Sequence, residues 1–317
     1  MGALPDSALS YYAKNPEATF TEYLAEVMAG LSQVKFTDSL RGQDNLIVPL
    51  VQIESATNLA PHGLGGNWIL QVSETTVLKV GWRVTMPEAE ALILLAAKTI
   101  VPVPTVLSAY MIGDVGFILM TKIEGGLLAS CLDTMSREEL QGIARQLKSY
   151  ILEWRELRSS FLGTVTGGPC QDILFRHPWD YKSTKQYGPF HFFTQYRYAV
   201  VEALRLSRPE GVWYEKEEKL KERILSFGDE RTTPILGVMT HGDLHPGNIF
   251  IKDGGVSGII DWGEAGYSLP ERESFAANRI AMDPAWVEMI HACIPSFPEE
   301  NELWDEVDRS MMRYSPL

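Results

Sequence analysis

The chain has 317 residues, 45% of them hydrophobic and 22% charged, which is typical of a globular protein with two domains or lobes. A net charge of −13 and a sequence pI of about 5.0 argue against a nucleic-acid partner, and no apolar run is long enough to span a membrane. The N-terminus lacks a signal-peptide pattern and the three cysteines are far apart, so we expect a cytoplasmic protein without disulfides.

The first part of the chain is predicted to form a helix followed by β-strands. Hydrophobic periodicity predicts helix within residues 6–33, and apolar runs predict strands at 48–53, 68–72 and 76–80. The loop before Trp68 contains Gly65 and Gly66, and glycines let backbone N–H groups approach phosphates closely. The spacing is not G-x-G-x-x-G, so taken alone this loop is better explained as an ordinary hairpin loop.

Lys79 lies within the apolar strand at 76–80, and a helix is predicted next at 87–98. A strand lysine paired with a glutamate of the following helix is the arrangement that holds a lysine against the α- and β-phosphates of a nucleotide. Both Glu88 and Glu90 lie in the first turns of the helix, and we choose Glu90 as the partner. The alternative is a lysine that extends to solvent at the edge of the sheet.

Residues 117–120 predict another buried strand, which leads into a linker between two lobes. Such a linker would present backbone groups to the edge of an adenine base, with Met120 at the back of the pocket, although a plain interdomain linker explains it equally well. We therefore divide the chain into residues 1–120, an N-terminal extension and nucleotide-binding small lobe, and residues 121–317, a hinge and helical catalytic and substrate-binding lobe.

The second part of the chain is predicted to be mainly helical. A capping box at Ser136–Glu139 begins a long amphipathic helix that runs to Trp154. Helical patterns return at three later places: 196–227, 284–293 and 302–312.

Two short motifs lie on either side of a predicted β-hairpin. Residues 240–250 read Thr-His-Gly-Asp-Leu-His-Pro-Gly-Asn-Ile-Phe, and residues 259–263 read Ile-Ile-Asp-Trp-Gly. The apolar runs 249–252 and 256–260 are separated by Asp-Gly-Gly, which is a turn signal. The motifs therefore meet at the open end of the hairpin.

This hairpin is predicted to bring two oxygen ligands together. If the turn is centred between Gly254 and Gly255, Asn248 lies directly opposite Asp261, with Cβ atoms about 4.5–5.5 Å apart. An amide oxygen and a carboxylate at this distance suit Mg²⁺. Asp243 precedes them in a glycine- and proline-rich loop, where it can accept a hydrogen bond from a hydroxyl group. These are the groups that phosphoryl transfer needs, although a surface hairpin with polar ends remains an alternative.

With these segments assembled, the chain resembles the aminoglycoside phosphotransferase (phosphotransferase enzyme) family of the protein-kinase-like fold, and most closely its fungal-type members. The resemblance extends over about residues 60–280 and rests mainly on His241–Ile249 and Ile259–Trp262. Weaker support comes from Leu78–Val80, Glu88–Ala91, Ile100–Pro104 and Gly188–Phe190. It implies an α+β, bilobal protein-kinase-like fold with a small N-terminal antiparallel β lobe carrying a helix and a larger, mainly α-helical C-terminal lobe.

The resemblance also implies roles for individual residues. Asp243 would be the catalytic carboxylate that orients the acceptor hydroxyl, and Asn248 and Asp261 would hold magnesium. His241 would be structural. The nucleotide would be bound by Lys79, which pairs with Glu90 and contacts the α- and β-phosphates, by the backbone of Thr121 and Ile123 beside Met120, and by Gly65 and Gly66.

We therefore expect an ATP- or GTP-dependent kinase that phosphorylates a hydroxyl of a small molecule with Mg²⁺. One candidate substrate is an aminoglycoside-like polycation. Its only support is the stretch from Glu264 onward, which contains 11 acidic and 4 basic residues. Another is a different small hydroxyl compound, such as a choline-like molecule or a secondary-metabolite intermediate. A third possibility is a kinase-fold protein repurposed as a nucleotide- or metabolite-binding module, or for non-kinase chemistry in a biosynthetic pathway. The oligomeric state does not follow from the sequence.

Overall fold

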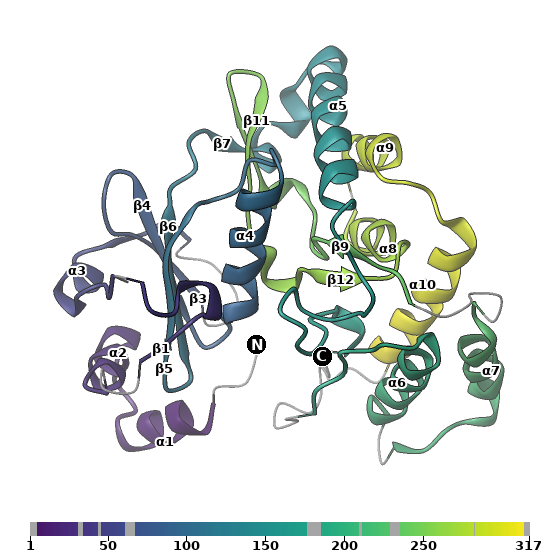
Figure 1. Ribbon diagram of the computed structural model, residues 1–317, viewed down its shortest axis with the longest axis horizontal. Helices are drawn as coiled ribbons and strands as arrows, with labels where there is room; N and C mark the ends of the chain where they lie inside the picture. The colour runs from purple at the N-terminus through teal and green to yellow at the C-terminus, as the bar shows by residue number, and fades with distance from the viewer. Residues whose placement is uncertain are drawn as a thin grey trace. The chain divides into compact units, whose positions relative to one another are not determined.

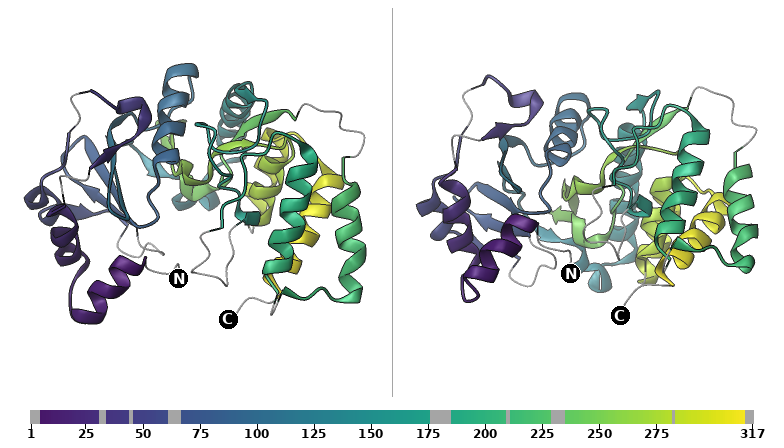
Figure 2. Two further views of the ribbon diagram at one scale, coloured as in Figure 1. Left: turned by 60° about the horizontal axis from the view of Figure 1, so that its bottom comes forward. Right: turned by 90° about the horizontal axis from the view of Figure 1, so that it is seen from below.

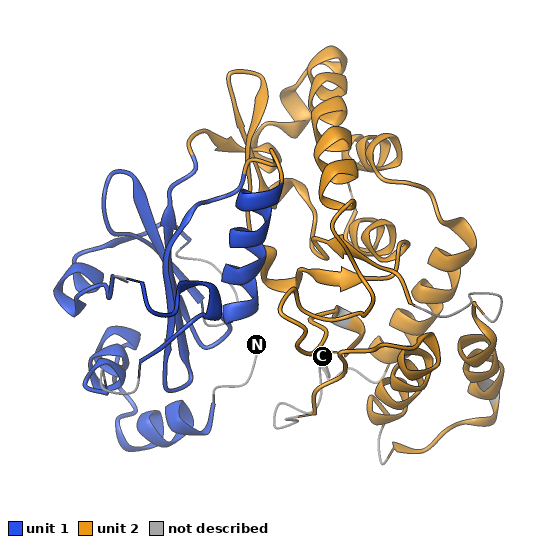
Figure 3. Ribbon diagram, in the orientation of Figure 1, with its two compact units in different colours: residues 1–98, 103–123 blue, residues 99–102, 124–317 orange. Residues whose placement is uncertain are grey.

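The computed structural model describes residues 5–30, 34–43, 46–60, 67–175, 185–208, 211–228, 235–281 and 283–313 (Figure 1). The chain divides into two compact units (Figure 3). Unit 1 comprises Met1–Lys98 and Val103–Ile123, and unit 2 comprises Thr99–Pro102 and Glu124–Leu317. Within the described ranges, no helix has both the length and the apolar character needed to cross a membrane.

Unit 1 is built on a six-stranded antiparallel sheet with the strand order β1-β5-β6-β4-β3-β2. The strands are β1 (Lys35–Phe36), β2 (Thr57–Asn58), β3 (Asn67–Gln71), β4 (Thr76–Gly81), β5 (Val106–Ile112) and β6 (Val115–Thr121). The three strands predicted around residues 68–72, 76–80 and 117–120 are thus confirmed as β3, β4 and β6. Side chains alternate along each strand between the two faces of the sheet.

Helices cover both faces of this sheet (Figure 2). Leu78 and Val80 of β4 share a buried cluster with Leu24 of α2, whereas Lys79, between them, points to the opposite face and pairs with α4. The helices of unit 1 are α1 (Asp6–Lys14), α2 (Phe20–Met28), α3 (Leu50–Glu54) and α4 (Met86–Lys98).

The predicted strand at residues 48–53 is wrong. After Pro49, residues Leu50–Glu54 form helix α3, in which only Ile53 is buried. A short apolar run cannot be assigned to strand or helix by periodicity alone. The helix expected within residues 6–33 is divided into α1 and α2, because the chain turns at Asn15-Pro16, and α2 begins at the capping box formed by Thr19 and Glu22.

Unit 2 is mainly helical and contains two small antiparallel sheets, with the orders β11-β10-β7 and β12-β9-β8. Its strands are β7 (Gly126–Leu127), β8 (Arg158–Ser159), β9 (Gly237–Thr240), β10 (Ile249–Lys252), β11 (Gly255–Ile259) and β12 (Gly266–Ser268). Its helices are α5 (Arg137–Trp154), α6 (Phe193–Leu206), α7 (Glu218–Ser226), α8 (Arg272–Arg279), α9 (Pro284–Cys293) and α10 (Pro298–Met312). The capping box predicted at Ser136 and Glu139 is present at the start of α5.

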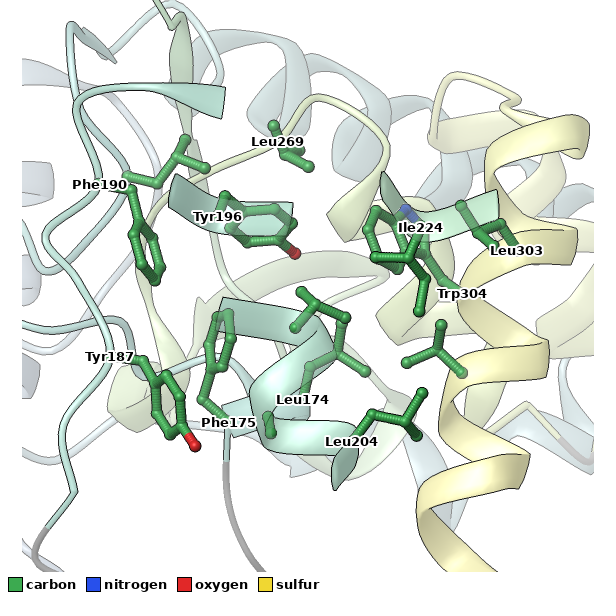
Figure 4. Close-up of a cluster of buried hydrophobic side chains, with 14 of the residues drawn as sticks. Leu174, Phe175, Tyr187, Phe190, Tyr196, Leu204, Ile224, Leu269, Leu303 and Trp304 are labelled. Carbon is green, nitrogen blue, oxygen red and sulfur yellow. The ribbon is translucent and has the colours of Figure 1, made fainter. Parts of the chain in front are cut away.

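The core of unit 2 is rich in aromatic side chains (Figure 4). Tyr196 of α6 lies edge-on to both Phe190 and Trp304, with ring centroids 5.6 and 5.9 Å apart. Phe275 of α8 and Leu269 belong to the same cluster and are buried. This packing fixes α8 and the segment before it, and α8 contacts the loop of residues 241–248.

Candidate active site

The loop of residues 241–248 follows β9 and is fastened through the buried side chain of His241. Its Nδ1 atom accepts the backbone N–H of Asp243 at 3.2 Å, so the proton of the neutral ring is on Nε2, which lies 3.0 Å from the carbonyl oxygen of Ile260 and donates to it. The ring also packs on Trp262, with centroids 4.4 Å apart. His241 therefore connects the two sequence motifs.

A second fastening comes from Glu273 of α8. Its carboxylate is fully buried and accepts the backbone N–H groups of His241 and Gly242 at 2.7 and 3.4 Å. Burial raises the pKa of Glu273 above its ordinary value, and these hydrogen bonds oppose that rise. Sequence analysis did not identify Glu273, because it lies about thirty residues beyond the loop and no local pattern indicates its role.

Asp243 and Asn248 lie side by side at the end of this loop. The Asn248 Nδ2 atom donates to the carbonyl oxygen of Asp243 at 2.9 Å and lies 3.5 Å from its carboxylate Oδ2. The same Oδ2 is 3.8 Å from Nε2 of His245, whose Nδ1 accepts the N–H of Gly247. The Asp243 side chain remains 31% exposed, so its carboxylate can accept a hydrogen bond from an incoming hydroxyl group.

The hairpin of β10 and β11 forms as predicted (Figure 1). At its open end the register differs from the prediction by one residue. The turn consists of Asp253 and Gly254, which both have positive φ, and a bulge on β11 inserts Ser257 as an unpaired residue. Asn248 therefore faces Ile260, whose N–H donates to the Asn248 carbonyl at 2.9 Å. The predicted direct opposition of Asn248 and Asp261 is wrong.

Asp261 follows immediately and has a left-handed backbone conformation, with φ 62° and ψ 61°. Its side chain is exposed, and its backbone adjoins that of Ile260, the partner of Asn248. Hydrogen bonds of Ile260 with Asn248 and His241 therefore join the backbone before Asp261 to the loop that carries Asp243 and Asn248.

The donor set in this region fits magnesium. Mg²⁺ prefers hard oxygen ligands and completes its octahedral shell with water and phosphate oxygens. The hydrogen bond from Asn248 Nδ2 turns the amide so that Oδ1 faces the other way, and Asp261 supplies a carboxylate. In the part of the chain that the structure describes, no three His, Cys, Asp or Glu side chains form a metal cluster. A cation held here would thus take its remaining ligands from water and from a bound phosphate group.

In unit 1, the buried partner of Lys79 is Glu88 and not the predicted Glu90. The Lys79 Nζ atom lies 2.7 and 2.9 Å from the two carboxylate oxygens of Glu88, and both side chains are almost fully buried. Two residues along a helix correspond to a rotation of about 200°, so Glu88 and Glu90 point to nearly opposite sides of α4. Glu90 instead accepts hydrogen bonds from Thr37 and Ser39.

The remaining residues predicted to bind the nucleotide differ in how accessible their side chains and backbone groups are. Met120 is buried on β6, two residues from the Ile118 that pairs with Lys79, so Met120 lies on the same face of the sheet as Lys79. The Thr121 N–H donates to the carbonyl oxygen of Thr105 at 2.9 Å, which leaves only the carbonyl of Thr121 to contact a base. Ile123 is half-buried at the end of unit 1. Gly65 and Gly66 lie outside the described residues.

A pocket in unit 2 borders the loop that carries Asp243. Its lining includes Cys170, Asp172, Gly242, Glu264, Tyr267 and Arg272. Arg272 and Asp172 form a bidentate ion pair, with N–O distances of 2.7 and 2.5 Å. The pocket thus contains both charges close to Gly242, the residue before Asp243.

Several solved structures resemble this chain. The complex of APH(2")-IIia with GDP and kanamycin has a TM-score of 0.55 at 15% sequence identity, and the match covers 91% of this chain and 89% of that one. The streptomycin-ATP-APH(2")-IIa ternary complex has a TM-score of 0.53 at 16% identity, covering 84% and 88%. The ADP-bound aminoglycoside phosphotransferase APH(2'')-Ib has a TM-score of 0.52 at 14% identity, covering 92% of each chain. These similarities confirm the predicted α+β, kinase-like fold.

A search of curated protein sequences finds no significant match. In contrast, the sequence model of the phosphotransferase enzyme family matches residues 62–289, which is more than half of the chain and includes Lys79, Asp243, Asn248 and Asp261. The resemblance inferred from the motifs is therefore confirmed at the level of the family, and with it the expectation of a small-molecule kinase. The chain belongs to the phosphotransferase enzyme family.

Proposed function

We propose that this protein transfers the γ-phosphoryl group of ATP, or of GTP, to a hydroxyl group of a small molecule. The observation that supports the proposal is the loop 241–248, which His241 and Glu273 hold in place and which leaves the Asp243 carboxylate accessible beside Asn248. Phosphoryl transfer requires mainly positioning and electrostatic stabilisation, which such a rigid loop supplies.

Each residue has a distinct role in this proposal. Asp243 accepts the hydrogen bond of the acceptor hydroxyl and orients its oxygen toward the phosphorus atom, and Asn248 and Asp261 hold magnesium. When bound, Mg²⁺ neutralises charge on the phosphate oxygens. Lys79, kept in place by Glu88, contacts the α- and β-phosphates. Residues 1–120 accordingly serve nucleotide binding, and residues 121–317 serve catalysis and acceptor binding.

The related structures support a nucleotide as the phosphate donor, but they do not all contain the same nucleotide. The related structures contain GDP, ATP and ADP, so both adenine and guanine nucleotides occur in this fold. Base recognition here would rely on the carbonyl of Thr121 and the backbone of Ile123, beside Met120. We expect ATP and GTP to be distinguished by titrating each, as its magnesium complex, into the protein.

The acceptor is proposed to bind at the exposed carboxylate of Asp243, beside the small pocket that Gly242 borders. Kanamycin and streptomycin in the related complexes support an aminoglycoside-like acceptor, as does the acidic balance of the chain. The pairing of Asp172 with Arg272 favours a second candidate, a hydroxyl compound with less positive charge, because this ion pair cancels one of the acidic groups of the pocket. A panel of aminoglycosides, choline-like amino alcohols and uncharged polyols, with ADP release as the readout, separates the two.

The proposal is tested with three aspartate-to-asparagine substitutions in the same region. Asp243→Asn should lower turnover by about 10²–10⁴-fold while the affinity for magnesium-ATP stays within about twofold of wild type. Asp261→Asn should weaken binding of the magnesium complex. Asp253→Asn, in the exposed hairpin turn, is the matched control and should change neither.

Wild-type turnover in Asp243→Asn would show that its role is wrongly assigned. If the wild-type protein binds magnesium-ATP but releases no ADP with any acceptor and does not hydrolyse the nucleotide, the repurposed binding module becomes the better explanation. A titration calorimeter and a coupled ADP assay provide both measurements.

A further inference from the structure

The buried carboxylate of Glu90 on α4 accepts hydrogen bonds from residues 37–39. This segment precedes residues 62–289, which match the family model. Glu90 is only 6% exposed. One oxygen accepts the Thr37 hydroxyl at 2.5 Å and the Ser39 backbone N–H at 2.9 Å, and the other accepts the Ser39 hydroxyl. Hydrogen bonds to an ionised group are the stronger class, so these three donors form a firm attachment between residues 37–39 and α4.

The donors are themselves held by the sheet of unit 1. Strand β1 pairs with β5, with Lys35 opposite Met111 and Phe36 opposite Tyr110, and the Thr37 N–H continues the ladder to the carbonyl of Ala109 at 3.0 Å. Thr37 is 3% exposed. Its hydroxyl therefore has a fixed position, and Ser39 follows within the short 3₁₀ turn of residues Asp38–Leu40.

Helix α4 is thus held on two opposite sides by its two buried glutamates. Glu88 faces β4 and pairs with Lys79, and Glu90 faces the segment 37–39. Because the two side chains project from one rigid helix only two residues apart, a shift or rotation of α4 at Glu90 displaces Glu88 as well. The distance between Glu88 and Lys79 consequently depends on the attachment at Glu90.

We propose that Thr37 and Ser39 are positioning residues for nucleotide binding: through Glu90 they hold α4 in the orientation in which Glu88 presents Lys79 to the phosphates. This inference rests on the proposed contact of Lys79 with the nucleotide. Both residues lie before residue 62, where the match to the family begins, so this chain supplies the attachment from its own N-terminal segment. The segment contributes to ligand affinity without contacting the ligand.

The experiment compares variants that keep or remove a single donor. Thr37→Ser keeps the hydroxyl, and Thr37→Val removes it at almost constant volume. Ser39→Ala removes one further donor but leaves the backbone N–H in place. Asp38→Ala is the matched control in the same turn, because this side chain is 70% exposed and forms its ion pair with Arg41, away from Glu90.

Affinity for magnesium-ATP is measured by calorimetry, well below the melting temperature of each variant. The double variant Thr37→Val/Ser39→Ala should bind about tenfold more weakly, which lies in the range of typical coupling between two sites. Thr37→Ser and Asp38→Ala should stay within about twofold of wild type. A lower melting temperature with unchanged affinity would mean that the attachment only stabilises the fold, and would overturn the inference. If the double variant does not fold, the affinity and melting temperature of Ser39→Ala alone are compared with those of wild type in the same way.

A double-mutant cycle with Lys79→Ala tests the route of the effect. If the attachment acts through Lys79, removing it in a Lys79→Ala background should weaken binding no further. An equal additional loss in that background would overturn the inference. If Lys79→Ala itself binds magnesium-ATP as wild type does, the nucleotide role of Lys79 fails and the inference fails with it. A loss in Lys79→Ala without any loss in the Thr37 and Ser39 variants would overturn the positioning role alone.

Discussion

At Gly242 the absence of a side chain lets the loop of residues 241–248 pack directly against the chain after Trp262. Gly242 has φ +82°, and a Cβ atom added there would lie 2.8 Å from the backbone oxygen of Glu264. Gly254 in the hairpin turn has a similar φ of +75° but no atom within 4 Å of such a Cβ. Substitution at Gly254 therefore measures the cost of the backbone conformation alone, and substitution at Gly242 adds the cost of the steric clash.

We predict that Gly254→Ala costs about 1–2 kcal/mol of unfolding free energy, which is the cost of a left-handed alanine. Gly242→Ala should cost clearly more, about 3 kcal/mol or above, because a clash with backbone is added to the same conformational cost. It should also lower turnover, since the loop carries Asp243. Urea unfolding of both variants gives the comparison, and equal costs would contradict the close packing at Gly242.

Among the single residues of the candidate site, the sequence motifs indicate which residues to choose but not which side chains they contact. The spacing of Asp243, Asn248 and Asp261 in two short motifs was sufficient to choose them from the sequence. The partner of Lys79 was not predictable, because Glu88 and Glu90 are both acidic, both near the start of α4 and both buried. Only the rotation of the helix about its axis, which is set by tertiary packing, decides which of them faces β4.

At the scale of elements, strands β3, β4 and β6 and helix α5 were predicted, whereas helix α3 and the register of the β10–β11 hairpin were not. The amphipathic pattern and capping box of α5 specify its start and its buried face. The five residues of α3 carry no such pattern, and the register of β10 and β11 depends on a bulge at Ser257 that Asp-Gly-Gly does not encode. Bulges and short helices are determined by contacts with the rest of the fold, so single-sequence reasoning misses them.

The start of α5 provides a test at this scale. Ser136 accepts the Glu139 N–H at 3.3 Å, and its own N–H and hydroxyl donate to the Glu139 carboxylate at 2.8 and 2.7 Å. We predict that Ser136→Ala destabilises the protein by about 1 kcal/mol. Ser149→Ala, the same change on the exposed face of the same helix, is the control and should be neutral or slightly stabilising.

The capping box should also depend on pH. Hydrogen bonds from the Ser136 side chain and backbone hold the pKa of Glu139 below its ordinary value of 4.5. A lowered carboxyl pKa stabilises the folded state above about pH 4.5, and this contribution is lost as the pH falls through the lowered pKa. The stability difference between wild type and Ser136→Ala should therefore shrink in acid, as urea unfolding at several pH values will show. A constant difference would mean that the carboxylate does not contribute to the cap.

At the scale of the whole molecule, the folded core extends beyond the part of the chain that matches the family. The match begins at residue 62, yet side chains of α1, α2 and α3 share one buried cluster with β3 to β6. Without these helices, Leu78, Val80, Phe117 and Leu119 would be exposed on one face of the sheet. The N-terminal helices are thus part of the structure that supports Lys79, in addition to the attachment at Glu90.

We therefore predict that a large-to-small substitution in α2 is as costly as one in the core of unit 2. Leu24 is 1% exposed and Leu204 is fully buried, so Leu24→Ala and Leu204→Ala should each reduce the unfolding free energy by about 2–5 kcal/mol. Leu9→Ala in α1 is the control, because this side chain is 45% exposed and its loss should change stability by less than about 0.5 kcal/mol. Urea unfolding followed by tryptophan fluorescence measures all three. A cost for Leu24→Ala as small as that for Leu9→Ala would mean that α2 is an appendage to the sheet and not part of its core.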